Sequence, residues 1–187
     1  DHQCADEPSD DQGMSRSTRS LIEWVAVIVG ALVVALIVKT FLVQAFYIPS
    51  ESMVPTLQVE DRVLVNKLSY RFGDISRGDV LVFDRPGGPG PDGISELIKR
   101  VIATEGETIQ ARDNQVVVGD PIDEDYLPDG TITGDFGPET VPEDHIWVMG
   151  DNRSASDDSR RFGAIPEDDV VGRAFVIIWP FSELGWL

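Results

Sequence analysis

The hydrophobic pattern divides the chain into one long apolar run and a remainder in which apolar and polar residues alternate. Residues 21–38 are apolar except for Glu23, and a run of this length crosses a bilayer as a helix. The polar stripe of an amphipathic helix is missing from it. Arg16 and Arg19 precede the run, and acidic residues dominate beyond it. The positive-inside rule therefore predicts a cytoplasmic N-terminus and an extracytoplasmic remainder.

A cleavable secretion signal is the competing interpretation, because Val43-Gln44-Ala45 loosely matches a small-residue cleavage site. The run is longer than a usual signal core and Lys39 interrupts it before that site, which favours an uncleaved anchor. We therefore expect a disordered acidic cytoplasmic tail over residues 1–20, a transmembrane helix over 21–43, and an extracytoplasmic domain over 44–187.

The domain after the anchor carries the pattern of short β-strands. Alternating or β-branched stretches are separated by residues that favour turns. Residues 86–93 are too rich in Gly and Pro for regular structure, and residues 120–144 are expected to form a loop or a short hairpin. The strands are expected at residues 61–67, 79–83, 97–103, 107–110, 115–119, 146–149 and 174–181.

The aromatic residues near the C-terminus admit two interpretations. Trp179, Phe181 and Trp186 follow the last expected strand. We expect them to pack in the core. The alternative is contact with a lipid interface, where aromatic rings concentrate.

Composition and charge exclude several kinds of partner and cofactor. Acidic residues outnumber basic ones 33 to 15, which gives a formal charge of −18 and argues against nucleic-acid binding. The single cysteine excludes an internal disulfide and a Cys-rich zinc site. The acidic cluster at Asp123, Glu124 and Asp125 lacks the spacing of a calcium-binding loop. We therefore predict no metal and no cofactor.

Histidine is too scarce for an ordinary catalytic triad. His2 lies in the acidic tail, and His145 precedes an apolar stretch and is expected at the start of a strand. A serine hydrolase built on this chain would therefore need another base.

A stiff loop containing two serines follows the apolar run. Pro49 and Pro55 bracket Ser50 and Ser52, and prolines exclude helix interior and central strand. Such a loop can hold one hydroxyl at a fixed angle, as nucleophilic catalysis requires. The alternative is a linker between the anchor and the domain.

Lys99 lies in the middle of an apolar stretch that is expected to be a strand. Alternation puts it on the same face as Leu97 and Val101. Desolvation of that kind lowers the pKa of a lysine and permits a role as general base. The alternative is an edge-strand lysine that prevents aggregation.

The loop from Gly150 to Arg160 is dense in small hydrogen-bonding side chains. A hydroxyl from this loop can orient Lys99, and Asp158 with Arg160 can form an ion pair. A capped surface turn is the alternative.

Four separated blocks together resemble the type I signal peptidases. They occur in the order of that family behind one apolar span. The blocks are Pro49-Ser50-Glu51-Ser52-Met53-Val54-Pro55-Thr56-Leu57, Arg77-Gly78-Asp79-Val80, Ile98-Lys99-Arg100-Val101, and Gly150-Asp151-Asn152-Arg153 through Asp158-Ser159-Arg160.

The resemblance implies a membrane-bound serine endopeptidase with a mainly β, antiparallel, partly open barrel domain. It would cut signal peptides from exported preproteins after small residues, at sites of the Ala-x-Ala type. Its partners would be preproteins, the lipid bilayer and the neighbouring export translocon, and its site would be extracytoplasmic.

The resemblance also assigns residues. Ser52 would be the nucleophile, Lys99 the base, Ser50 an oxyanion-hole donor, and Ser156 a hydrogen-bond partner of the Lys99 amine. Asp151, Asp158 and Arg160 would brace these groups. The substrate pockets would be lined by Phe46, Ile48, Met53, Leu97 and Ile98.

Two other functions fit parts of the sequence. A self-cleaving, repressor-like Ser/Lys protease lacks the apolar span and carries a partner domain that is not seen here. A membrane-anchored β-domain that binds a partner without catalysis would not need Ser52 or Lys99 at all.

Overall fold

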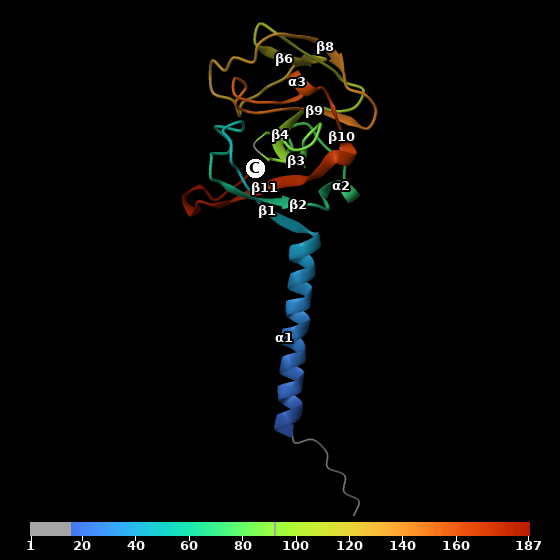
Figure 1. Cartoon of the computed structure of the whole chain (residues 1–187), viewed down its shortest axis with the longest axis vertical. Coiled ribbons are helices and arrows are strands. Elements are labelled where there is room, and N and C mark those ends of the chain that lie inside the picture. The colour runs from blue at the N-terminus through green and yellow to red at the C-terminus, as the bar shows by residue number, and fades with distance from the viewer. Residues whose placement is uncertain (1–15, 92) are drawn as a thin grey trace, which may run out of the picture. The chain divides into compact units, whose positions relative to one another are not determined.

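A computed structural model describes residues 16–91 and 93–187, and the chain divides into two units, residues 1–40 and 41–187 (Figure 1). Helix α1 (Arg16–Phe41) forms the described part of the first unit. It begins before Leu21, where we expected the anchor to start, because neither proline nor glycine separates Arg16 from the apolar run. The rest of the expected disordered tail lies outside the described residues.

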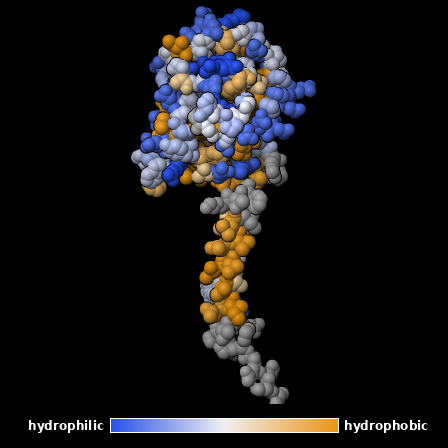
Figure 2. Space-filling view, viewed as in Figure 1, coloured by the Kyte–Doolittle hydropathy of each residue, from blue (hydrophilic) through white to orange (hydrophobic). Residues whose placement is uncertain are grey.

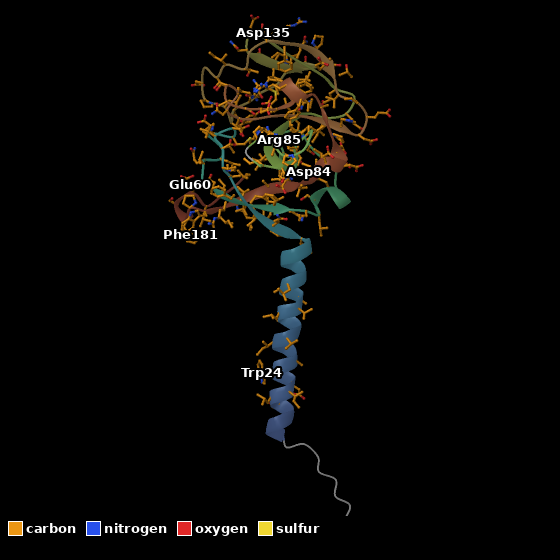
Figure 3. All side chains as sticks on the ribbon, in the orientation of Figure 1. Trp24, Glu60, Asp84, Arg85, Asp135 and Phe181 are labelled. Atoms are coloured by element: carbon orange, nitrogen blue, oxygen red, sulfur yellow. The ribbon has the colours of Figure 1, made fainter. Side chains whose placement is uncertain are left out.

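The apolar side chains of α1 are exposed. Figure 2 shows them as an orange surface along the helix, and Leu21, Trp24, Ile28 and Leu32 are each more than half exposed. Figure 3 shows the side chain of Trp24 pointing away from the helix axis. Within residues 16–91 and 93–187, no helix combines the length and apolar character that a membrane span needs.

The second unit is built on two antiparallel sheets, as the mainly β prediction required. The larger sheet has eight strands in the order β1-β2-β11-β3-β4-β9-β10, with β12 paired to β11. Its strands are β1 (Val43–Tyr47), β2 (Arg62–Asn66), β3 (Val80–Asp84), β4 (Glu96–Ala103), β9 (His145–Met149), β10 (Ile165–Pro166), β11 (Val170–Trp179) and β12 (Gly185–Trp186).

The smaller sheet has the order β7-β6-β5-β8. Asp113 and Asn114 connect β5 to β6 with positive φ angles, the geometry of a tight hairpin turn. Short helical turns complete the unit. The remaining elements are β5 (Thr108–Arg112), β6 (Gln115–Val118), β7 (Asp120–Pro121), β8 (Phe136–Thr140), α2 (Ser69–Phe72), α3 (Ser159–Phe162), and the 3-10 turns η1 (Glu167–Asp169) and η2 (Phe181–Glu183).

Strand predictions were correct where alternation was strong and incomplete elsewhere. β11 begins at Val170, before the expected 174, because Gly172 and Arg173 pair with β3. The expected loop over 120–144 contains β7 and β8. β8 carries Gly137 and Pro138 and is largely exposed. A proline is tolerated there because β8 is an edge strand.

The C-terminal aromatic residues do not pack in the core, so that expectation was wrong. Trp179, Phe181 and Trp186 are 45%, 71% and 81% exposed. Trp179 and Phe181 pack against each other edge to face. Trp186 packs against Phe175 with the rings tilted and their centroids 6.0 Å apart.

Strand β4 positions the candidate site. Its residues from Glu96 to Arg100 pair with β3 on one side, whereas pairing with β9 begins only at Arg100, opposite Met149. The first half of β4 therefore has one edge that no strand covers, and the chain leaves β9 into the Gly150 loop directly beside Lys99.

Candidate active site

Buried apolar side chains on both sides of Ser52 fix the loop over residues 48–57. This loop is called the nucleophile loop, after the role proposed for Ser52 below. Ile48, Met53 and Leu57 are buried in one hydrophobic cluster. Within the loop, Val54 N–H donates to Glu51 O at 3.0 Å and Leu57 N–H donates to Met53 O at 2.9 Å. The Ser52 side chain is thereby held in place with only 6% of the residue exposed.

Lys99 lies against Ser52. The residue is 2% exposed, and its Nζ donates to Ser52 Oγ at 2.8 Å and to the Ile98 carbonyl at 2.7 Å. The amine and the hydroxyl are therefore within proton-transfer distance, 47 residues apart in the sequence.

The surroundings of Lys99 favour the neutral amine. Burial lowers its pKa to about 8, and this effect outweighs the opposing attraction of Asp158 and Asp157. Arg85 contributes a smaller lowering. A lysine with this pKa can accept a proton from a serine hydroxyl near neutral pH.

Ser50 lies next to this pair. Its Oγ is 3.4 Å from Ser52 Oγ, and the residue is exposed. A hydroxyl in this position, together with the Ser52 backbone N–H, can donate to an oxyanion that forms on a carbonyl attacked by Ser52.

The loop after β9 holds the nucleophile loop through its main chain. Asn152 N–H donates to Ser52 O at 3.0 Å, and the Asn152 side chain donates to Glu51 O at 3.2 Å. At Gly150, an added Cβ would lie 2.5 Å from Ser52 O and would also collide with Ser156 Oγ. Only glycine permits this approach.

Asp158 and Arg160 form the expected ion pair. Arg160 donates from Nε and from Nη2 to the two carboxylate oxygens, each at 2.8 Å, and Gly150 N–H donates to Oδ2 at 3.0 Å. Burial alone would raise the pKa of Asp158, but these hydrogen bonds more than offset it and hold the pKa low. The carboxylate therefore stays charged and fixes the start of the loop.

Asp151 connects β4 to the nucleophile loop. Its carboxylate accepts from Arg100 at 2.9 and 2.7 Å and from Thr56 Oγ1 at 2.6 Å. The guanidinium of Arg100 also lies over the Tyr126 ring, 4.1 Å from its centroid. Sequence reasoning missed Thr56, Arg100 and Tyr126 as site residues. The positions of Thr56 and Arg100 within the quoted blocks were the available signal.

Ser156 differs from its expected arrangement. We expected its hydroxyl to hydrogen-bond the Lys99 amine, but the buried Ser156 Oγ has no hydrogen-bond partner among the described residues. The amine donates instead to Ile98 O. Ser156 Oγ lies near Gly150 and close enough to Asp158 to help lower the pKa of that carboxyl.

Four of the five expected pocket residues come together. Ile48, Met53 and Ile98 are buried in one cluster, and Phe46 packs against it. Leu97 packs against a different cluster, because successive strand residues point to opposite faces.

The other candidate groups lie apart from Ser52. His145 begins β9, and its Nδ1 lies 2.7 Å from Glu143 O. Glu124, from the acidic cluster, pairs with Arg153. No group of three His, Cys, Asp or Glu side chains in residues 16–91 and 93–187 is arranged to hold a metal ion.

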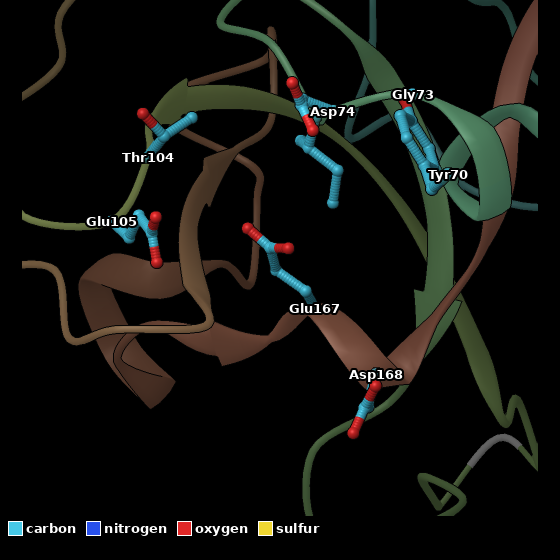
Figure 4. A pocket seen from close by; sticks show the side chains of 8 residues that line it. Tyr70, Gly73, Asp74, Thr104, Glu105, Glu167 and Asp168 are labelled. Carbon is cyan, nitrogen blue, oxygen red and sulfur yellow. The ribbon is translucent and has the colours of Figure 1, made fainter.

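A hollow of about 460 Å³ elsewhere in the second unit is strongly acidic (Figure 4). Glu105 and Glu167 face each other across it, with Asp74 nearby. Burial and these carboxylates raise the pKa of Glu167. The residues that line this hollow include neither Ser52 nor Lys99.

In this β-sheet unit a buried lysine amine is hydrogen-bonded to a serine hydroxyl. This arrangement is typical of one class of protein, the serine hydrolases in which lysine replaces histidine as the base. A family model described as "Signal peptidase, peptidase S26" matches residues 21–179. The chain therefore belongs to the signal peptidase family, peptidase S26, and is a serine endopeptidase that cleaves signal peptides. Members of this family are in general membrane-associated.

Several relatives match over most of their length. "Signal peptidase I" of Leptolyngbya laminosa is 42% identical over 174 residues, covering 89% of this chain and 84% of the relative. "Signal peptidase I P" of Bacillus subtilis subsp. natto is 36% identical over 180 residues, covering 90% and 95%. A crystal structure of a signal peptidase I from Enterococcus faecalis is 31% identical, covers 54% of this chain and 96% of that chain, and has a TM-score of 0.44.

Proposed function

We propose that Ser52 and Lys99 form the catalytic dyad with which this enzyme cuts signal peptides from exported preproteins. The observation that carries the proposal is the 2.8 Å contact between Lys99 Nζ and Ser52 Oγ in a buried environment. The neutral Lys99 amine takes the Ser52 proton while Oγ attacks the scissile carbonyl carbon.

The remaining steps use the same groups. Ser50 Oγ and the Ser52 N–H donate to the oxyanion of the tetrahedral intermediate. The Lys99 ammonium then gives its proton to the departing amine, which leaves an ester between Ser52 and the signal peptide. Lys99 next activates a water that hydrolyses this ester and restores the free Ser52 hydroxyl.

Ser156 has a supporting role in this scheme. Lys99 Nζ already donates to Ser52 Oγ and Ile98 O, so an ammonium has one donor left. The buried, unpartnered Ser156 Oγ is a suitable acceptor for that donor once Lys99 is protonated. Asp158, Arg160 and Asp151 hold the loop that carries Ser156.

The signal peptide would bind as an added strand. The edge of β4 from Glu96 to Lys99 lacks a strand partner on the β9 side, and β1 is an end strand of the sheet. Either edge offers main-chain hydrogen bonds to an extended peptide. Ile48, Met53 and Ile98 form part of one buried apolar cluster, and bulky walls of this kind would accept only small residues, as in Ala-x-Ala sites.

We further propose that α1 anchors the protein in the membrane, with residues 44–187 outside the cytoplasm and near the export translocon. The exposed apolar side chains of α1 support this, as do the exposed Trp179, Phe181 and Trp186, which suit a lipid interface. A catalytic site just beyond an anchor meets a signal peptide as it emerges.

The full chain in detergent, with a synthetic preprotein that has one Ala-x-Ala site, tests the dyad. We expect Ser52→Ala and Lys99→Ala each to reduce kcat/KM by at least about a thousandfold, because neither group works alone. Ser95→Ala and Lys67→Ala are matched controls at exposed hydrogen bonds and should retain activity. Undiminished cleavage by either dyad variant would refute the proposal and would favour a binding domain without these catalytic groups.

A further inference from the structure

A cavity of about 420 Å³ lies directly beside the nucleophile loop. Val54 and Pro55 of that loop form one wall, and the loop after β9, from Asp151 to Ser154, forms another. Residues 128–132, from the connection between β7 and β8, form the third. Three segments that are far apart in sequence therefore enclose this space.

The third wall is firmly attached to the loop after β9. The buried Arg153 pairs with Glu124, which precedes residues 128–132 in the chain. Arg153 also donates at 2.9 Å to Oγ1 of Thr133, which follows them. Arg160 donates to Thr133 O at 2.9 Å. Contacts at both ends of this wall make the cavity a built feature of the fold.

The cavity is connected to the loop that carries Ser52 through Asn152. Asn152, which lines it, donates from its main chain to Ser52 O and from its side chain to Glu51 O. Under the proposed function, the signal peptide pairs with the edge of β1 or of the first half of β4, on one side of Ser52. Val54 and Pro55 follow Ser52 in the loop and line the cavity, so the chain beyond the scissile bond would reach it on passing over them.

We propose that this cavity binds the first residues after the scissile bond, that is, the N-terminal residues of the mature protein. The inference rests on the proposed function, because it takes Ser52 as the point of cleavage. It assigns to this chain a second determinant of specificity, separate from the pockets for small residues before the cut.

The charges of the lining residues define which side chains fit. Asp151 is neutralised by Arg100, and Arg153 by Glu124. Asp129 is exposed and makes no ion pair with a described residue. The free charge in the cavity is therefore negative, and an acidic residue entering it is repelled. Ile132 is 68% exposed at the same wall and offers an apolar contact.

The test compares preproteins that share one Ala-x-Ala site and differ only at the first three positions after it, with Lys, Ser or Asp at each. For the full chain in detergent we expect the Asp substrates to be cleaved about two- to fivefold less efficiently than the Lys substrates, the range for an exposed charge pair. Asp129→Lys should reverse or abolish this preference. Glu139→Lys, an equal change of charge on exposed β8, should preserve it.

Ile132→Ser adds a second readout that does not depend on charge. It should weaken cleavage of substrates with Leu after the cut relative to those with Ser. The inference would be overturned if Asp129→Lys and Ile132→Ser both kept the wild-type substrate preferences after the cut. It would also be overturned if they altered only the preferences at positions before the cut. Ser52→Ala is the control for the proposed function. If this variant still cleaved the preproteins, Ser52 would not be the point of cleavage, and the dyad proposal would fail whatever the cavity variants showed.

Discussion

Lys99 is the residue whose protonation should set the pH dependence of the enzyme. Burial lowers its pKa to about 8, so the neutral base is a minor form at pH 6 and the major form at pH 9. We predict that kcat/KM rises about tenfold per pH unit below pH 8 and levels off above it. Rate measurements from pH 6 to 10 check this. A midpoint near pH 6.5, the ordinary range of a histidine, would contradict Lys99 as the base.

The same burial means that Lys99 lowers the free energy of unfolding at neutral pH. Its pKa in the folded protein, about 8, lies below the ordinary lysine value of 10.5. Between about pH 8 and pH 10.5 the unfolded chain binds more protons than the folded protein, so stability rises with pH across this window. At pH 7 the cost is at most about 3 kcal/mol.

Lys99→Met should therefore unfold at higher urea concentration than the wild type at pH 7. The gain should shrink as the pH approaches 10.5, where the amine is neutral in both states. Lys67→Met, at an exposed lysine bonded to Gln44, is the control and should show no such trend. A variant that is less stable than wild type at pH 7 would contradict the sign of this argument.

Gly150 is required because the nucleophile loop approaches it closely. In Gly150→Ala, the new Cβ would press on Ser52 O and Ser156 Oγ, and the backbone at Ser52 cannot yield without moving the nucleophile. We expect kcat to fall at least about a hundredfold, as for a misplacement of about 1 Å. Gly137→Ala, where no atom lies within 4 Å of the added carbon, should keep wild-type kcat.

At the scale of elements, the connection between β7 and β8 is tied to the loop after β9 by Arg160, which donates to Thr133 O, and by the buried cation Arg153. The Arg153 side chain is fully buried and also donates to Gly150 O at 3.2 Å. Its carboxylate partner, Glu124, is mostly buried. Glu124→Gln would leave that cation without a counter-charge, which typically costs about 3 kcal/mol or more.

We predict that Glu124→Gln lowers both the free energy of unfolding and kcat, because Gly150 moves with Arg153. The double variant Glu124→Leu with Arg153→Met should recover part of the stability, since no charge then remains buried. Urea unfolding together with steady-state kinetics checks both effects. Equal losses in the single and double variants would show that the ion pair itself is not the source of stability.

The strands that the sequence predicted well are those with at least one buried face. β2 alternates, β3 and β9 are buried on both faces and nearly continuously apolar, and all three were found nearly as expected. β8 has no such pattern because it is an exposed edge strand, and the start of β11 depends on pairing with β3. Partners distant in the chain decide these elements, so local periodicity does not reveal them.

The candidate site was likewise predictable only where a residue is unusual within its own segment. Ser52 and Lys99 stood out because each is unusual in its own segment, a serine between prolines and a lysine among apolar residues. Arg153 and Glu124 did not, because each resembles an ordinary charged surface residue until the fold buries them together. The resemblance predicted a hydrogen bond between Ser156 and the Lys99 amine, but the Ser156 hydroxyl makes none with a described residue, because its position depends on how distant loops pack.

At the scale of the whole molecule, the proposed attachment to the membrane can be assigned to one of the two units by experiment. The second unit has its own hydrophobic clusters and contains Ser52 and Lys99, whereas α1 carries the exposed apolar side chains. We predict that a chain starting at Phe41 still cleaves a preprotein in detergent but floats far less with vesicles of zwitterionic lipid. Binding that remains should depend on the exposed aromatic residues and fall in Phe181→Ser with Trp186→Ser.

The formal charge of −18 lets lipid charge and salt serve as further variables in this experiment. Anionic lipid repels an acidic surface at low salt, so residual binding of the shortened chain should be weaker on anionic vesicles and should recover as salt screens the charge. The full chain should float equally with both lipids, because burial of apolar side chains from α1 dominates its binding. If the shortened chain floated as well as the full one, the aromatic residues and not α1 would be the main attachment to the membrane.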